Sequence, residues 1–173
     1  LLVVDDDWAY TGGINISRVY GSSSFGRRSK AKDISSSDDG WRDTQIELAG
    51  PVVPVLAREF ATAWKDQGCI GALGAAPPPR TATPGPRVVK VLASDPRDET
   101  NRIYTSLIQA IAASQRSVLL TMAYFAPGDE FAAALADAAR RGVAVELVLP
   151  GKSDSALVLH AGRAYYTQLL DAG

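Results

Sequence analysis

The sequence is poor in the residues that most often carry metal or thiol chemistry. Its 173 residues include one cysteine, one histidine and one methionine. The single cysteine, Cys69, can form neither an internal disulfide framework nor a paired-cysteine metal site. With one histidine and one cysteine, the chain supplies neither a zinc site nor a Ser-His-Asp triad of its own. We expect His160, in the segment LVLHAGR, to lie at or near the surface of a helix.

Long apolar runs and an excess of one charge are also missing. No stretch approaches the roughly 20 apolar residues of a membrane-spanning helix, and no secretory signal is visible. The 18 basic and 19 acidic side chains nearly cancel, so net charge favours neither nucleic acid nor an anionic membrane. The basic cluster GRRSKAK, at 26–32, is typical of a solvated loop. Contact with phosphates or lipid head groups is the alternative.

What is present is a globular composition, with 46% apolar and 21% charged residues, which supports a buried core. The first part of the chain predicts a hairpin of two strands (1–5 and 8–12), joined by an acidic turn, and a third strand at 44–50. A helix follows Pro51 and Pro54. Its expected apolar positions are Val55, Leu56, Phe60 and Trp64.

The second part alternates strands and helices after a proline-rich linker. The linker, 71–87, carries five prolines and no helical or strand period. The expected elements are strands at 88–93, 117–125 and 143–150, and helices at 98–114, at 129–141 and from Asp154 onward. The apolar faces predicted for the first and last of these helices are Ile103, Leu107, Ile108 and Ile111, and Leu157, Val158, Tyr165 and Leu169. This alternation favours an α/β fold with a mainly parallel sheet flanked by helices.

The opening hairpin ends in a motif that suits close contact with another group. Asp5 is followed, after six residues, by Gly12 and Gly13, and Asn15 lies two positions further on. Glycines let the backbone approach a neighbouring group closely, and an asparagine amide offers both donors and an acceptor. On their own, these residues are better explained by a tight turn with a hydrogen-bonded asparagine.

The spacing D-x6-G-G-x-N, entered by four apolar residues, resembles the end of the signature H-x-K-x4-D-x6-G-[GS]-x-N of the phospholipase D superfamily. Further ordered blocks resemble the bacterial cardiolipin synthase branch of that superfamily over nearly the whole chain. They are WRDTQIELAGP (41–51), SDP (94–96), AYFAP (123–127), AARRGVAVELVLP (138–150), SDSALV (153–158) and RAYYTQLLDAG (163–173).

The resemblance implies a bilobal enzyme with one H-x-K motif in each lobe and a shared active site. On this basis 1–70 is the end of the first lobe, 71–87 is a linker, and 88–173 is most of the second lobe. One histidine attacks a phosphodiester and forms a phosphohistidine, while the other protonates the leaving alcohol. In the synthase branch the acceptor is a glycerol hydroxyl of another lipid. No metal or other cofactor is required.

The resemblance also assigns roles to individual residues. Asn15 becomes a phosphate-binding amide, and Gly12 and Gly13 give the backbone close access beside it. Asp5 is the signature aspartate, and we expect it to organise the hairpin. Asp43 occupies the place of an acid that accepts a hydrogen bond from the catalytic imidazole, although an exposed aspartate at a strand entry is the alternative.

Two further residues follow strands of the second half. Tyr124, with Phe125 beside it, is expected to end a central strand, where α/β sheets bind ligands. It is therefore a candidate for the lipid head-group or glycerol site, while core packing is equally open for Phe125. Asp154 lies at the next strand end, and we interpret it as the cap of the last helix.

The chain contains neither H-x-K motif and has its only methionine at Met122. We therefore expect a fragment from the interior of a longer enzyme, inactive alone, rather than a degenerate homologue. The implied partners are a phosphatidylglycerol-like phospholipid and a membrane surface, with no nucleic acid, and the implied location is the bacterial inner membrane or its cytoplasmic surface. Two alternatives stay open: a phospholipase or nuclease that uses water as acceptor, and a lipid-surface binding protein without catalysis.

Overall fold

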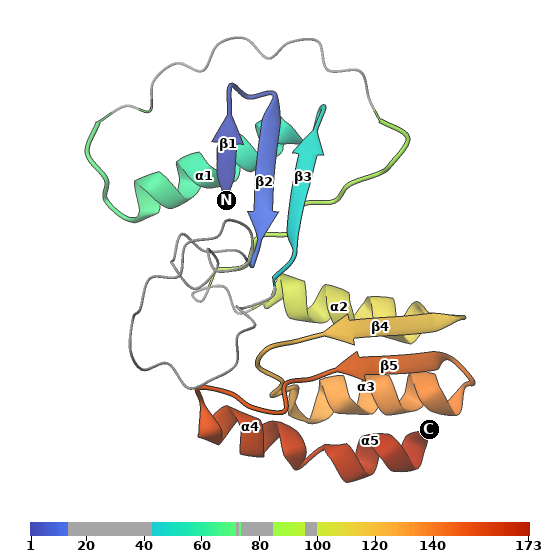
Figure 1. Ribbon diagram of the computed structural model, residues 1–173. Helices are drawn as coiled ribbons and strands as arrows, with labels where there is room; N and C mark the ends of the chain where they lie inside the picture. The colour runs from blue at the N-terminus through green and yellow to red at the C-terminus, as the bar shows by residue number, and fades with distance from the viewer. Residues whose placement is uncertain (14–42, 72, 74–84, 96–99) are drawn as a thin grey trace, which may run out of the picture. The chain divides into compact units, whose positions relative to one another are not determined.

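The computed structural model describes residues 1–13, 43–71, 73, 85–95 and 100–173 (Figure 1). The chain divides into two compact units, Leu1–Val91 and Leu92–Gly173. Each unit has its own small sheet and its own apolar core.

The first unit is built on a three-stranded antiparallel sheet in the order β1-β2-β3. The strands are β1 (Leu2–Val4), β2 (Trp8–Gly12) and β3 (Gln45–Ala49). Between β1 and β2, Asp5 and Asp6 take positive φ angles of 54° and 55°. Two successive residues of positive φ make the tight turn whose twist matches a hairpin, and aspartate tolerates this conformation better than most residues.

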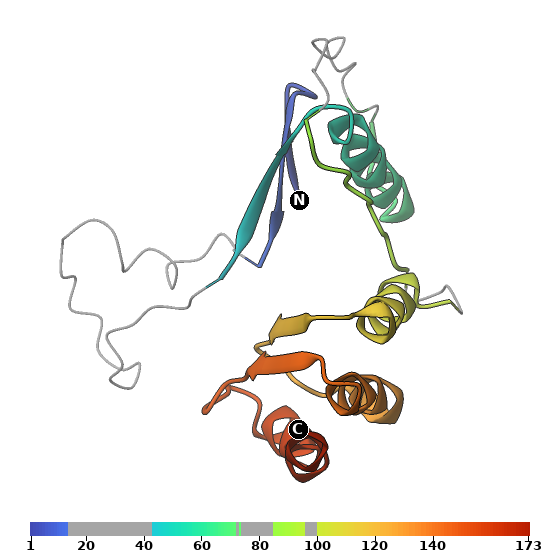
Figure 2. The same ribbon diagram turned by 90° about the vertical axis from the view of Figure 1, so that its right-hand side faces the viewer.

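Helix α1 (Val53–Asp66) covers one face of this sheet (Figure 2). Pro54 lies in its first turn, where a missing N–H costs no hydrogen bond. Val53 and Leu56 pack against Ala9 of β2. Of the predicted apolar positions, Leu56 is therefore buried, whereas Phe60 is 43% exposed.

The second unit is built on two parallel strands, β4 (Ser117–Thr121) and β5 (Ala144–Val148). Helices α2 (Arg102–Ala113) and α3 (Gly128–Arg140) lie on the same side of both strands (Figure 2). Helices α4 (Ala156–Arg163) and α5 (Tyr166–Ala172) complete the unit. The core joins Ile111, Phe125, Phe131, Leu135, Ala138 and Val143. The predicted charges of α3 are confirmed, with Asp129 and Glu130 in its first turn and Arg140 in its last.

Several sequence expectations for the second half are wrong in detail. No strand is assigned at 88–93; Val91 instead packs against the core of the first unit, while Val88 is fully exposed. Strand β4 ends at Thr121 rather than at 125, so Tyr124 and Phe125 lie in the loop that follows it. In α2, Ile103 and Leu107 are exposed, because Tyr104, Ile108 and Ile111, spaced by four and three residues, form the buried stripe.

The last helix also differs from its prediction. It is two helices, α4 and α5, separated at Ala164 and Tyr165. The side chain that caps α4 belongs to Ser155 and accepts from Val158 N, so Asp154 is not the cap. Leu157 is 82% exposed rather than packed. His160 lies exposed on α4, as expected.

The described residues form a mixed α/β structure with one antiparallel and one parallel sheet. Exposed and half-buried residues alternate along β4 and β5, so one face of the parallel sheet is exposed. On this face Leu119 is 73% and Val148 is 64% exposed. No helix among the described residues is long and apolar enough to cross a membrane.

Candidate active site

The first cluster of predicted site residues lies where β2 and β3 meet at the end of the hairpin. The N–H of Gly13 donates to the carbonyl oxygen of Thr44 at 3.1 Å. A Cβ atom added to Gly13 would lie 2.5 Å from Oδ1 of Asp43, and one added to Gly12 would overlap the Thr44 carbonyl oxygen. Gly13 therefore lets the backbone pass directly beside the Asp43 carboxylate, and Gly12 lets it pass beside Thr44 and Gln45.

Antiparallel register explains why residues thirty positions apart in sequence meet here. Gly12 pairs with Gln45 at the end of the β2–β3 ladder, so the chain leaving β2 runs next to the chain entering β3. Asp43 and Gly13 each lie just beyond this last pair. The structure thus brings together three of the predicted site residues, Gly12, Gly13 and Asp43.

Asp5 does not belong to this cluster. Asp5 is in the β1–β2 turn, at the opposite end of β2 from Gly12. A backbone hydrogen bond from Asp7 N to Val4 O, 3.1 Å long, closes that turn. Asn15 lies outside the described residues. The hairpin position of Asp5 suits a role in organising the turn, which remains a prediction.

A tyrosine and a glutamate flank the cluster on the sheet. Tyr10 of β2 stands opposite Glu47 of β3. The hydrogen bond to Glu47, followed by burial and the charge of the same carboxylate, raises the pKa of the Tyr10 phenol above its ordinary value. In this bond the Tyr10 hydroxyl is the donor and the Glu47 carboxylate is the acceptor.

A second cluster lies at the carboxyl ends of β4 and β5, which point to the same edge (Figure 1). The hydroxyl of Tyr124, in the loop after β4, donates to Oδ1 of Asp154, in the loop after β5, at 2.7 Å. Ser153 Oγ donates to the same oxygen at 3.4 Å. The bond from Tyr124 joins two loops that are thirty residues apart in sequence.

Close packing fixes the loop that carries Tyr124. Phe125 is 3% exposed and belongs to the core of the second unit. Gly162 of α4 lies so close to this loop that an added Cβ would overlap the carbonyl oxygen of Phe125. Tyr124 itself remains 44% exposed. The core thus holds one aromatic ring of the pair and presents the other to solvent.

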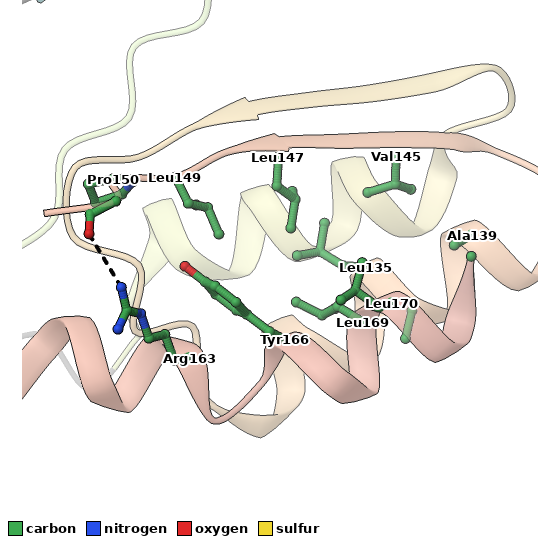
Figure 3. A pocket seen from close by; sticks show the side chains of 13 residues that line it. Leu135, Ala139, Val145, Leu147, Leu149, Pro150, Arg163, Tyr166, Leu169 and Leu170 are labelled. Atoms are coloured by element: carbon green, nitrogen blue, oxygen red, sulfur yellow. Dashed lines mark hydrogen bonds between the residues drawn. The ribbon is translucent and has the colours of Figure 1, made fainter.

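An apolar groove of about 430 Å³ lies along β5, between α3 and α5 (Figure 3). Arg163 closes one end and donates to the carbonyl oxygen of Gly151 at 3.3 Å. The rest of the lining is mainly aliphatic, including Leu135, Val145, Leu147, Leu149, Leu169 and Leu170. The groove contains neither Tyr124 nor Asp154, and its lining offers no acid–base pair. Among the described residues there is also no group of three or more potential metal ligands.

Comparison with known proteins identifies the family. A family model described as "Cardiolipin synthase, PLD-like domain" matches residues 107–173. Cardiolipin synthase A of Yersinia pseudotuberculosis serotype O:1b (strain IP 31758) and that of Yersinia pestis bv. Antiqua (strain Angola) are each 30% identical to the chain over 179 aligned residues. The chain belongs to the phospholipase D superfamily, in its cardiolipin synthase branch.

The two alignments cover 100% of the chain and 34% of each relative. The chain therefore spans about a third of the length of the curated cardiolipin synthases that it matches. No solved structure matches it.

Sequence reasoning missed the contact between Tyr124 and Asp154. Asp154 precedes a helix, and aspartate is a common cap, so capping explained it without a partner. Ser155, which is also a common capping residue, follows immediately. Two candidate caps in succession leave one side chain available for another contact, and this was the signal in the sequence.

Proposed function

We propose that the protein containing this chain is a phosphatidyltransferase of the cardiolipin synthase type. It transfers a phosphatidyl group from a phosphatidylglycerol-like donor to a glycerol hydroxyl of a second lipid. The observation that carries this proposal is the 30% identity to cardiolipin synthase A along 100% of the chain. The close approach of Gly13 to Asp43 supports it, and Gly12 and Gly13 stand at the spacing of the family signature.

The proposed reaction has two displacements at phosphorus. In the first, a histidine nitrogen forms a P–N bond and the P–O bond to the leaving glycerol breaks, while a second histidine gives that oxygen a proton. In the second, the acceptor hydroxyl returns a proton to the second histidine and forms a new P–O bond, and the P–N bond breaks. Both histidines are restored, and no electrons are gained or lost.

Neither histidine belongs to this chain. His160 is the only histidine and has Gly162, not lysine, two positions later. We propose that both His-x-Lys pairs lie in parts of the protein outside these 173 residues, and that this chain is inactive alone. From this chain, the Asp43 carboxylate accepts a hydrogen bond from a catalytic imidazole and fixes its tautomer. Asn15 donates to a phosphate oxygen, beside the close backbone at Gly12 and Gly13.

The proposed substrate places the protein at a lipid surface. Phosphatidylglycerol is a membrane component, so the enzyme works on a membrane, which for this branch is the bacterial inner membrane or its cytoplasmic side. A bilobal arrangement, with the two compact units as parts of the two lobes, belongs to the same proposal.

The product formed from phosphatidylglycerol vesicles by the full-length protein tests the proposed function. We expect cardiolipin and free glycerol in equal amounts, without added metal. Phosphatidic acid as the only lipid product would instead establish a hydrolase with water as acceptor. Vesicle binding without any turnover would establish a non-catalytic lipid-binding protein. The isolated 173-residue chain serves as the inactive control.

A further inference from the structure

The hydrogen bond between Tyr124 and Asp154 is the part of the second unit that its fold leaves unexplained. We propose that the Asp154 carboxylate binds a hydroxyl of the acceptor alcohol, a polyol such as a lipid's glycerol head group, and that Tyr124 is the residue that positions this carboxylate. The inference rests on the proposed function and adds to it the residues that select an alcohol over water.

Tyr124 and Asp154 lie at the edge of the parallel sheet where both strands end. Thr121 and Val148, the last residues of β4 and β5, pair with each other, so both strands end at one edge. Tyr124 follows the first strand by three residues and Asp154 follows the second by six. Loops at the carboxyl ends of adjacent parallel strands are the usual ligand-binding place of an α/β sheet.

The hydrogen bonds at this edge both point toward the Asp154 carboxylate. Tyr124 Oη and Ser153 Oγ both donate to Oδ1 of Asp154, at 2.7 and 3.4 Å. Ser153 Oγ in turn accepts from the N–H of Ser155 at 3.1 Å, which orients the serine hydroxyl. The carboxylate is therefore held from two loops. An ionised carboxylate has two oxygens with about four acceptor sites, so two incoming bonds leave capacity for a ligand hydroxyl.

The charge of the pair selects the kind of ligand. Asp154 is exposed, and its carboxylate is the acceptor in the hydrogen bonds from Tyr124 and Ser153. An acceptor with negative charge attracts hydroxyl donors and repels a phosphate anion. The site therefore suits the alcohol that attacks rather than the phosphodiester that is attacked. A polyol offers several hydroxyls and gains more from such a site than water does.

A second tyrosine–aspartate pair in the same unit provides a matched control. Tyr165 Oη donates to Asp129 Oδ1 at 3.0 Å. This bond joins the start of α5 to the first turn of α3, where both helices pack on the core. Its chemistry equals that of Tyr124 and Asp154, but its geometry is fully explained by helix packing.

The test measures how the full-length enzyme divides its turnovers between an added alcohol and water. Phosphatidylglycerol vesicles are incubated with deuterated glycerol at increasing concentration, and labelled phosphatidylglycerol, cardiolipin and phosphatidic acid are quantified by mass spectrometry. The variants are D154N and Y124F, with D129N and Y165F as controls. The readout is the glycerol concentration at which labelling is half-maximal.

We expect D154N to raise this concentration about tenfold, because the charged acceptor of the hydrogen bond is lost. We expect Y124F to raise it about threefold, because the carboxylate stays but is misaligned. The controls stay within about twofold of the unmodified enzyme. Thermal unfolding checks that each variant is folded.

Two results would overturn the inference. One is a half-maximal glycerol concentration that is the same in D154N and Y124F as in the unmodified enzyme. The other is an equal loss of donor cleavage and labelling in both variants, which would place the pair on the phosphate instead. An unmodified enzyme that transfers to no alcohol at all would refute the proposed function first, and the inference with it.

Discussion

Single side chains tie the loops and helices of the second unit together by hydrogen bonds to carboxylates and carbonyls. Tyr165 donates to Asp129, and Arg141 donates to the carbonyl oxygens of Ile111 and Ala112 at the end of α2. A cation at the last carbonyls of a helix also complements the helix dipole. These bonds lie at element ends, where backbone groups and charges need partners.

The Tyr165–Asp129 bond predicts an alkaline limit to the stability of this unit. The hydrogen bond to Asp129, then burial and the charges of Asp129 and Tyr104, raise the pKa of the Tyr165 phenol above its ordinary value near 10.0. A group that holds its proton more tightly when folded stabilises the fold below its unfolded pKa and loses this contribution as pH rises through its folded pKa. We therefore expect the stability difference between the unmodified chain and Y165F to be constant at neutral pH and to shrink above about pH 10.

Urea unfolding at a series of pH values, with ultraviolet titration of tyrosinate, measures both quantities. The Y10F variant serves as the parallel control, because it removes the phenol of the first unit whose pKa is raised. A Y165F difference that is equal at about pH 8 and about pH 11 would show that this phenol does not keep its proton in the fold.

At the residue scale, the family resemblance named candidate site residues but not the contacts between them. It gave Gly13 and Asp43 separate roles, and the antiparallel register is what brings the two residues together. The role of Asp43 toward an imidazole stays a prediction. Asp154 was assigned to the wrong partner, because local capping and a contact thirty residues away use the same side-chain chemistry.

At the level of elements, helices α2 and α3 of the second unit form a layer on one side of β4 and β5 (Figure 2). Helix α3 supplies the centre of this layer, with Leu135 and Ala138 fully buried. Helix α4 contributes less to the core, since Leu157 is 82% exposed and Gly162 makes its tightest contact. The stability of the unit therefore depends more on α3 than on α4.

Truncation of one leucine on each helix tests this ranking. We expect L135A to destabilise the second unit by about 2–5 kcal/mol, because it opens a cavity in a packed core. L157A is expected to change stability by less than about 0.5 kcal/mol, because the side chain is already in water. Amide hydrogen exchange in α3 and β5 reports on this unit alone. Equal losses in the two variants would mean that α4 is packed as the periodicity suggested.

Element types were more predictable than their ends and faces. The periods and charges of α3 located it to within one residue of its observed bounds. The apolar run 117–125 could not show that β4 stops at Thr121, because the buried loop residue Phe125 is as apolar as a strand residue. In α2, two apolar stripes overlap, and only packing decides that the one containing Tyr104 is buried.

At the scale of the whole molecule, the order of short blocks predicted the superfamily, and the comparisons confirm it. Such blocks are recognisable because several specific stretches, such as D-x6-G-G-x-N and WRDT, occur in one order along the chain. The phosphatidyltransferase activity is a proposal, since this chain spans 34% of the relatives' length and holds no His-x-Lys pair. The central claim is therefore that these residues serve histidines located elsewhere in the protein.

Trapping the covalent intermediate tests that claim most directly. The full-length protein is incubated with phosphatidylglycerol labelled in its phosphatidyl group, quenched in denaturant and mapped by peptide mass spectrometry. The account predicts a phosphoramidate, stable to alkali and labile to acid, on a histidine outside residues 1–173. Label on His160, or turnover with no histidine adduct at any time point, would contradict it.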